Sequence, residues 1–216
     1  MLPKSAFGQD ELALLTLARQ CHGRGWSFAT SGNYSIRVSP RSFLITPSGF
    51  DKGTLGAGDL LLVDDEGRAL EPGFGAASVP SAETLLHAQI YRRRPRVHCI
   101  AHTHSLAATM TSRAFADEGR LSWTGYEIVK ALAGVDSHEA AVHLPIFAND
   151  QDMARLARHI DAEIGDNDTI HGYLLAGHGL YTWGKDVEET RRHLEALEFL
   201  LDCSLYACFP AMMGRG

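Results

Sequence analysis

Two short apolar runs that contain histidines constrain this chain more than any other feature. The first spans residues 97–104 and ends in His102, Thr103 and His104, and the second spans residues 173–179 and holds His178 between two glycines. Apolar runs of this length are typical of buried strands. Successive side chains of a strand point to opposite faces, so residues two apart point the same way. We therefore expect His102 and His104 to aim their imidazoles at one point.

These three histidines predict a metal site. Three neutral imidazole nitrogens with an open fourth position are typical of a catalytic divalent metal centre, and His178 would add the third nitrogen to those of His102 and His104. The glycines beside His178 allow its backbone to approach a ligand closely. The alternative is a structural role, because the chain has 11 histidines and a His-x-His spacing alone is a weak signal. The whole pattern favours a metal-dependent enzyme.

Length and composition predict one domain that spans residues 1–216. The chain has 216 residues, of which 45% are hydrophobic, and this is enough to bury a substantial core. Its formal net charge of −6 disfavours nucleic acids and anionic membranes as partners. The first residues do not resemble a signal peptide, no window approaches the roughly 20 apolar residues of a membrane span, and the four cysteines lack CxxC spacing. We expect a cytoplasmic protein.

Hydrophobic periodicity predicts a sheet with helices on both faces. Strands are expected where short apolar runs lie between turn residues, at 34–38, 43–46, 60–64, 97–104, 140–147, 173–176 and 180–183. Helices are expected at 9–22, 81–94, 125–133, 150–164 and from 186 onward. The last helix has a wider apolar surface than one face needs, which indicates a subunit interface. The glycine-rich residues 66–79 predict a surface loop.

Three segments combine hydroxyl side chains with a glycine or a helix start, at residues 30–33, 46–49 and 80–83. Free backbone N–H groups at such turns and helix N-termini bind anions. Each segment alone is more simply an ordinary turn or cap. Together, in a chain with a candidate metal site, they predict a phosphate-bearing substrate. None of them resembles a P-loop or a dinucleotide fingerprint, which disfavours a nucleotide cofactor.

Two carboxylates are candidates for acid–base chemistry. Glu83 falls in the first turn of a predicted helix, where a negative charge is stabilising in any case. Glu127 follows Thr124 at the spacing of a capping box, which is the structural alternative for that residue. Beside a metal ion that acidifies protons next to a bound carbonyl, either carboxylate could act as the general base.

The order of these motifs resembles the class II aldolase/adducin superfamily. The motifs that carry the resemblance are Gly32-Asn33, Ser48-Gly49, Ser81-Ala82-Glu83, His102-Thr103-His104 and Gly177-His178-Gly179. Longer segments, at residues 28–33, 81–87, 145–152 and 177–184, are similar to the branch of the superfamily that dehydrates methylthioribulose 1-phosphate in methionine salvage. The similarity extends from about residue 25 to residue 209.

The resemblance implies a three-layer α/β/α sandwich around a mixed, largely antiparallel sheet. It also implies a zinc ion bound by His102, His104 and His178, and a homotetramer with its sites near subunit boundaries. The residues that it implies for the substrate phosphate are Gly32, Asn33, Ser48, Gly49 and Ser81. Sugar-phosphate aldolases carry two serines before the glutamate, whereas this chain has Ala82 in place of one, which leaves the phosphate contacts of this segment open.

For the acid–base group, the resemblance points two ways. In the aldolases the matching residue is Glu83, whereas the dehydratase branch assigns the role to Glu127, which we favour. The implied reaction removes water from 5-methylthioribulose 1-phosphate and yields the 2,3-diketo-5-methylthiopentyl phosphate. Two alternatives stay open: an aldolase or 4-epimerase acting on a related ketose phosphate, and a metal-free interaction module with the same architecture.

Overall fold

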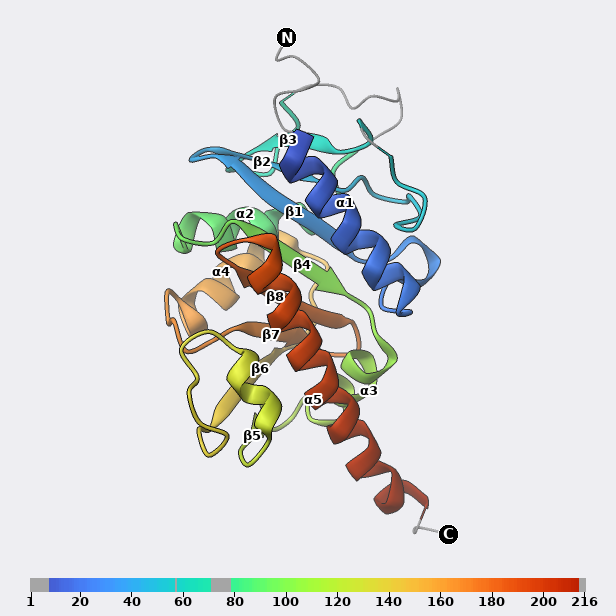
Figure 1. Ribbon diagram of the computed structural model, residues 1–216, viewed down its shortest axis with the longest axis vertical. Coiled ribbons are helices and arrows are strands. Elements are labelled where there is room, and N and C mark those ends of the chain that lie inside the picture. The colour runs from blue at the N-terminus through green and yellow to red at the C-terminus, as the bar shows by residue number, and fades with distance from the viewer. Residues whose placement is uncertain (1–7, 57, 71–78, 214–216) are drawn as a thin grey trace.

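The chain folds around an eight-stranded sheet (Figure 1). The computed structural model describes residues 8–56, 58–70 and 79–213, and within these ranges the strand order is β3-β2-β1-β4-β8-β7-β6-β5. β6 and β7 pair in parallel, and the other neighbouring pairs are antiparallel, so the expected mixed sheet is confirmed. The strands are β1 (Asn33–Ser39), β2 (Ser42–Ile45), β3 (Leu61–Asp64), β4 (Cys99–Thr103), β5 (Arg120–Trp123), β6 (Val142–Phe147), β7 (Gly172–Leu175) and β8 (Gly179–Gly184).

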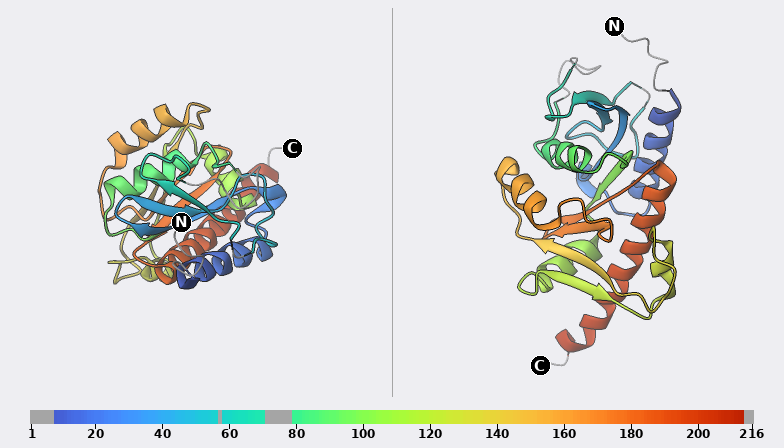
Figure 2. Two further views of the ribbon diagram at one scale, coloured as in Figure 1. Left: turned by 90° about the horizontal axis from the view of Figure 1, so that it is seen from above. Right: turned by 90° about the vertical axis from the view of Figure 1, so that its left-hand side faces the viewer.

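Helices cover both faces of the sheet (Figure 2). On one face, α1 (Gly8–Gly23) and the long α5 (Val187–Met213) pack together, and on the other, α2 (Thr84–Arg93) packs against α4 (Met153–Ile164). Buried hydrophobic side chains form two clusters, one under each pair of helices. The three-layer α/β/α sandwich implied by the resemblance is therefore confirmed.

The central strands are apolar without alternation because both of their faces are covered. In β7, Leu174 belongs to the cluster under α1 and α5, whereas Tyr173 and Leu175 belong to the cluster under α2 and α4. This division explains why the run before His178 has no polar face, and it confirms that the run is a buried strand.

Three elements differ from the sequence-based expectation. Helix α3 (Leu106–Ala114) and the edge strand β5 lie outside the predicted set. The helix expected at residues 125–133 is wrong, because only a short 3-10 helix, η2 (Glu127–Ala131), forms there. Gly125 and Gly134 both have positive φ and bracket this segment, so the chain turns before a full α-helix can form.

Only part of the loop expected at residues 66–79 lies within the described residues. Ala69 forms an isolated bridge to Val63, so the first residues of this segment lie beside β3. Residues 71–78 of the expected loop lie outside the described residues.

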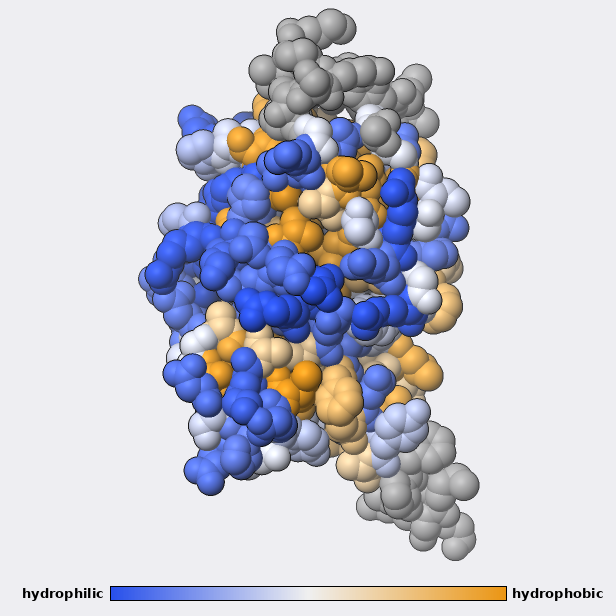
Figure 3. Space-filling view, viewed as in Figure 1, coloured by the Kyte–Doolittle hydropathy of each residue, from blue (hydrophilic) through white to orange (hydrophobic). Residues whose placement is uncertain are grey.

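The surface seen in Figure 3 is mainly hydrophilic, with apolar areas, one of which lies where η2 meets α5. On α5, Phe199 is 52% exposed and Tyr206 is 74% exposed, in agreement with the wide apolar surface predicted for the last helix. Within the described ranges, no helix has both the length and the apolar character that are needed to cross a bilayer.

A buried carboxyl group joins α5 to the histidine-bearing strand. Glu198 on α5 is 1% exposed and accepts a hydrogen bond from Thr103 Oγ1 at 2.7 Å. Its pKa is raised to about 7, because burial and, to a smaller extent, the nearby Asp202 outweigh the lowering effect of hydrogen bonds from Ser105 and Thr103. The folded state therefore binds this proton more tightly than the unfolded state does.

This raised pKa gives a stability that declines as the pH rises. The contribution is complete below the ordinary pKa of a glutamate and is lost as the pH rises toward about 7, above which a charged Glu198 costs roughly 3 kcal/mol. We expect Glu198→Gln to be more stable than the wild type at pH 8 and to lose this advantage below pH 5. Urea unfolding across this range measures the difference.

Glu195 supplies the control for this prediction. It lies one turn away on the same helix, and its carboxylate accepts hydrogen bonds from Arg24 and Arg191. Glu195→Gln is expected to give no gain at pH 8. Equal stability of Glu198→Gln and the wild type at every pH would contradict the assignment.

Candidate active site

Strand β4 delivers two histidines to one point. All residues of β4 are buried, and the chain leaves the strand after Thr103, where Ser105 caps α3 by accepting a hydrogen bond from Ala108 N. His102 and His104 lie on the same face, with ring centroids 4.6 Å apart, whereas Thr103 between them faces Glu198. The alternation expected from the sequence therefore holds through the end of the strand.

The turn between β7 and β8 brings His178 to the same point. Its ring centroid lies 5.0 Å from that of His102 and 4.4 Å from that of His104. This approach depends on Gly179, because a Cβ atom there would lie 2.0 Å from Thr103 O and 3.3 Å from His102 Cε1. Only glycine allows β8 to begin so close to β4.

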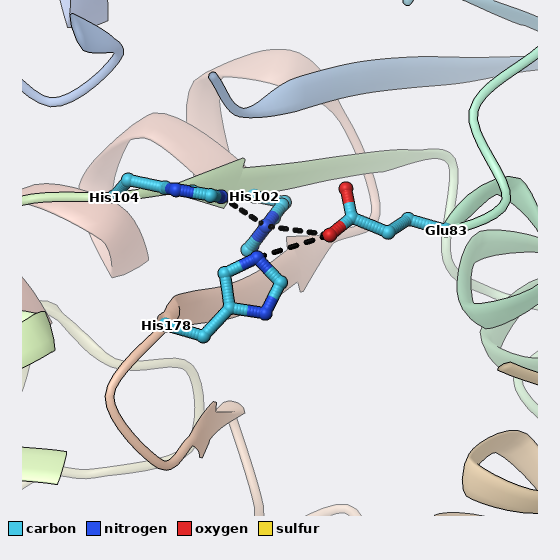
Figure 4. Close-up of side chains that lie close together, drawn as sticks. All are labelled: Glu83, His102, His104 and His178. Atoms are coloured by element: carbon cyan, nitrogen blue, oxygen red, sulfur yellow. Dashed lines mark hydrogen bonds and ion pairs between the residues drawn. The ribbon is translucent and has the colours of Figure 1, made fainter. Parts of the chain in front are cut away.

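Glu83 is the fourth member of the cluster (Figure 4). It directly precedes α2, and its Oε1 atom lies 3.0 Å from His178 Nε2 and 3.8 Å from His102 Nε2. Each of the four residues offers one donor atom, and these atoms lie within 4.8 Å of one another. Because a carboxylate lies directly among three imidazoles, the structure brings Glu83 to the site as well as the three predicted histidines.

The surroundings fix the orientation of His102. Its Nδ1 donates to Leu180 O at 3.0 Å, so the lone pair is on Nε2, which faces the other histidines. Its ring also stacks on Tyr181, with centroids 3.9 Å apart. A hydrogen bond from the far nitrogen to a carbonyl is the usual arrangement for a histidine that binds a metal ion.

The charges of the cluster also suit a cation. Burial is the largest cause that lowers the pKa of His104, to about 4, and burial keeps the pKa of His102 well below its usual range. Burial alone would raise the pKa of Glu83, but its hydrogen bond with His178 and the other nearby histidines outweigh burial and lower it. At neutral pH, His102 and His104 are therefore uncharged and Glu83 is ionised, which is a donor set for a divalent metal ion.

The segments predicted to bind phosphate lie at the same end of the sheet. Because β1 and β4 are antiparallel, Asn33 at the start of β1 pairs with His102 at the end of β4. Ser48 N donates to Val79 O at 3.3 Å, which ties the turn after β2 to the residues before α2. The residues of this prediction, all at this end of the sheet, are Gly32, Asn33, Ser48, Gly49 and Ser81.

Within this group, Asn33 and Gly32 have structural roles in the site. The Asn33 side chain donates from Nδ2 to Glu83 Oε2 at 2.6 Å, so it already holds the carboxylate of the cluster. Gly32 has a φ of +74°, and a Cβ atom there would lie 2.7 Å from His102 O. By contrast, Ser48 and Gly49 are exposed and Ser81 is half-buried.

A buried lysine that lies outside the predicted site residues supports the edge of the site. Lys52 is 1% exposed, and its Nζ donates to Thr30 O at 2.7 Å and to Phe50 O at 2.8 Å. Ala29 and Thr30, in the 3-10 helix η1 (Phe28–Thr30), both have positive φ, which is uncommon for residues other than glycine. The ammonium group therefore stabilises a strained loop that borders the histidines.

An open cavity lies between this loop and the cluster. Its lining includes Phe28 and Ala29 on one side and His104, His178 and Gln151 on the other. Phe28 is 64% exposed and is one of the residues that line this cavity.

Glu127 lies at the opposite end of the sheet from the histidines. β5 runs antiparallel to β6, and β6 runs in the same direction as β4, so η2, which follows β5, lies at the end of the sheet where β4 begins. The Glu127 side chain is 70% exposed, forms an ion pair with Lys130 and lies 3.7 Å from His138 Nδ1. One copy of the chain therefore does not bring Glu127 to the histidines, which lie where β4 ends.

The family follows from a match over almost the whole chain. A family model described as Class II Aldolase and Adducin N-terminal domain matches residues 12–205. The chain belongs to the class II aldolase and adducin family. Class II aldolases depend on a metal ion, and the cluster of three histidines and Glu83 has the donor atoms to hold one.

Relatives within the class II aldolase family are similar over nearly their full length. The chain is 49% identical over 201 residues to a methylthioribulose-1-phosphate dehydratase from Sorangium cellulosum, with 93% of each chain covered. It is 48% identical over 198 residues to a protein of the same name from Stenotrophomonas maltophilia, with 91% of each chain covered.

Solved structures of the class II aldolase family share the fold. An L-fuculose-1-phosphate aldolase from Thermus thermophilus is 26% identical, with a TM-score of 0.71, 95% of this chain covered and 97% of that chain. A sugar-phosphate aldolase from Thermotoga maritima is 17% identical, with a TM-score of 0.67, 96% of this chain covered and 97% of that chain. The second similarity bears on the fold alone.

Proposed function

We propose that this chain is a methylthioribulose-1-phosphate dehydratase, a hydro-lyase of methionine salvage. The observation that carries the proposal is the 48–49% identity to dehydratases of that name over more than nine-tenths of both chains. The cluster of His102, His104, His178 and Glu83 supports it, because loss of water next to a carbonyl needs a stabilised oxyanion. The substrate is then a phosphorylated ketose, and the product is the 2,3-diketo-5-methylthiopentyl phosphate.

The metal that we propose is zinc, held by His102, His104 and His178. Three imidazole nitrogens leave a position for substrate, as catalytic zinc sites do. Bound zinc would act as a Lewis acid that stabilises negative charge on the substrate oxygens at C2 and C3. Glu83 lies beside this position and is held there by Asn33, so its carboxylate can complete the donor set before substrate arrives.

Other residues of the chain would bind the substrate and transfer its protons. The hydroxyl groups of Ser48 and Ser81 and the backbone N–H of Gly49 would receive the phosphate, which anchors C1. A carboxylate removes the proton from C3 and leaves an enediolate, the C4 hydroxyl departs with a proton from a carboxylic acid, and the resulting enol tautomerises to the diketone. The proton taken and the hydroxyl lost together make one water molecule. Phe28 offers an apolar surface for the methylthio group.

We assign the proton transfer to Glu127 from a neighbouring copy of the chain. The fold places Glu127 at the opposite end of the sheet, so it can act only on the site of another subunit. Glu127 is well exposed, and the surrounding surface includes Tyr126, Ile128 and Phe199, of which Phe199 is 52% exposed. An apolar surface around an exposed carboxylate suits a subunit contact. We propose the homotetramer that the family resemblance implies.

Replacing Glu127 should lower turnover without loss of metal. Removal of a general base costs roughly 10²- to 10³-fold, so we expect Glu127→Gln to keep zinc and fold while losing turnover by this factor. Refolding Glu127→Gln together with His104→Ala should restore activity at about a quarter of the sites, where a complete histidine set meets an intact Glu127.

A mixture of His104→Ala and His178→Ala is the matched control, because both changes damage the same part of one chain. It should stay inactive. If the Glu127→Gln mixture is equally inactive, or if Glu127→Gln alone retains near-normal turnover, the proton transfer returns to Glu83.

The direct test of the function is incubation of the zinc-loaded protein with 5-methylthioribulose 1-phosphate. We expect diketone absorbance to appear with release of water. Retro-aldol cleavage or epimerisation of another ketose phosphate, without dehydration of this substrate, would replace the proposal by the aldolase or epimerase alternative.

Two further features complete the proposal. The strands of the sheet extend from Asn33 to Gly184, which supports one domain over residues 1–216.

The cysteines are free thiols, which suits the reducing cytoplasm, and they are Cys21, Cys99, Cys203 and Cys208.

A further inference from the structure

A continuous chain of hydrogen bonds leads from the candidate metal site into the core under α2. Glu83 Oε2 accepts from Asn33 Nδ2 at 2.6 Å, and Asn33 Oδ1 lies 2.5 Å from His87 Nε2. The chain continues from His87 Nδ1 to Ser35 Oγ at 2.7 Å and from Ser35 Oγ to Tyr91 Oη at 2.9 Å. We call these five residues the Glu83 relay.

The direction of each hydrogen bond follows from the carboxylate end. An ionised Glu83 can only accept, so Asn33 must present its NH₂ group to it and its carbonyl oxygen to His87. That oxygen can only accept, so His87 carries its proton on Nε2 and has a lone pair on Nδ1. Ser35 then donates to Nδ1 and accepts from Tyr91.

The burial of the relay keeps this arrangement fixed. Ser35 and His87 are 0% exposed, Tyr91 is 3% exposed and Asn33 is 4% exposed. Burial lowers the pKa of His87 to about 3, so its ring stays neutral and keeps one donor and one acceptor nitrogen. Its ring also lies edge-on to Tyr181, which stacks on His102.

We propose that His87 is a positioning residue, which holds the Asn33 amide in the one orientation that binds the Glu83 carboxylate at the histidine cluster. The inference deepens the proposed function, because Glu83 contributes to the metal site of that reaction. Without the proton on His87 Nε2, the Asn33 amide is free to turn and place its oxygen against the carboxylate. Glu83 would then lose its only side-chain hydrogen bond from the relay.

The first test measures zinc affinity without substrate, by competition with a chelator. Loss of a residue that supports a metal ligand typically weakens binding about 10- to 100-fold, and we expect this loss in His87→Leu. His87→Gln keeps an N–H at the place of Nε2 and should bind zinc nearly as well as the wild type. Gln89→Leu is the control, because Gln89 is a buried polar residue of the same helix whose bond goes to Asp161 instead.

Wild-type zinc affinity in His87→Leu would overturn the proposal, and so would equal losses in His87→Gln and His87→Leu. A double-mutant cycle with Asn33→Ala adds a second criterion. If His87 acts through Asn33, the double variant should bind zinc no more weakly than Asn33→Ala alone. Losses that simply multiply would show that His87 acts by another route.

A spectroscopic measurement on the wild type covers the case in which a variant does not fold. Nitrogen-15 NMR of histidine side chains distinguishes a protonated ring nitrogen from an unprotonated one. We expect His87 to be neutral and protonated on Nε2, and a proton on Nδ1 would overturn the relay. Because neither zinc affinity nor this spectrum involves substrate, failure of the dehydratase assay leaves both results interpretable.

Discussion

His102→Ala should abolish zinc binding and lower dehydratase turnover by roughly 10³-fold or more. His102 lies at the centre of the cluster, with its Nε2 atom 2.8 Å from His104 Nε2 and 3.8 Å from Glu83 Oε1. The hydrogen bond from His102 Nδ1 to Leu180 O orients the ring so that Nε2 faces the other three residues of the cluster. Replacing His102 by alanine removes this oriented imidazole. Elemental analysis of the purified variant and the turnover assay measure the two effects.

The fully buried position of His102 could also make its loss destabilising, so a second variant is needed. His104 is only partly buried, and His104→Ala is expected to fold normally and to show the same loss of zinc and turnover. The control is His143→Ala, because His143 is exposed on β6 and its side chain bonds to Ser122, away from the cluster. Full zinc content with near-normal turnover in both cluster variants would refute the metal site.

Gly179→Ala is expected to destabilise the fold by roughly 3 kcal/mol or more and to remove the metal site with it. The new methyl group would lie 2.0 Å from Thr103 O, which is backbone and cannot rotate away. β4 and β8 would have to separate at the centre of the sheet, where His102 pairs with Tyr181. Urea unfolding and zinc content measure the outcome.

Gly177 provides a control in the same turn. It has a φ of +66°, but a Cβ atom there meets nothing within 4 Å. Gly177→Ala should therefore cost only the strain of a left-handed alanine, about 1–2 kcal/mol. A Gly179→Ala variant that is as stable as Gly177→Ala, with its zinc intact, would show that the two strands have more freedom than the structure indicates.

The sequence predicts the strands well because their signals are local. The alternation that puts His102 and His104 on one face needs no knowledge of the rest of the fold. By contrast, α3 combines alanine and threonine without a clear apolar face, and β5 has only four residues at the edge of the sheet. The segment around Glu127 carries helix-like apolar spacing, but the glycines at both ends leave too few residues for an α-helix.

Spacing alone groups only His102 and His104, which share one strand, whereas His178 and Glu83 were candidates because of their own local motifs. Glu83 reaches the histidines because α2 begins beside β1, and this contact depends on tertiary packing. His87 lies four residues after Glu83, so helical spacing could have placed both on one side of α2. The bond to Asn33 that gives His87 its role depends on the packing of α2 against β1. Lys52 left no signal, because its partners are backbone carbonyls.

The separation of Glu127 from the histidines has a consequence for how such an enzyme evolves. When one copy offers the ion and another offers the base, natural selection for turnover also acts on the surface that joins the copies. If Glu127 acts on a neighbouring copy as we propose, a drift substitution at Phe199 of α5, which lies beside Glu127, can abolish catalysis at a site that belongs to another copy. Sites of this kind tie the history of the assembly to the history of the chemistry.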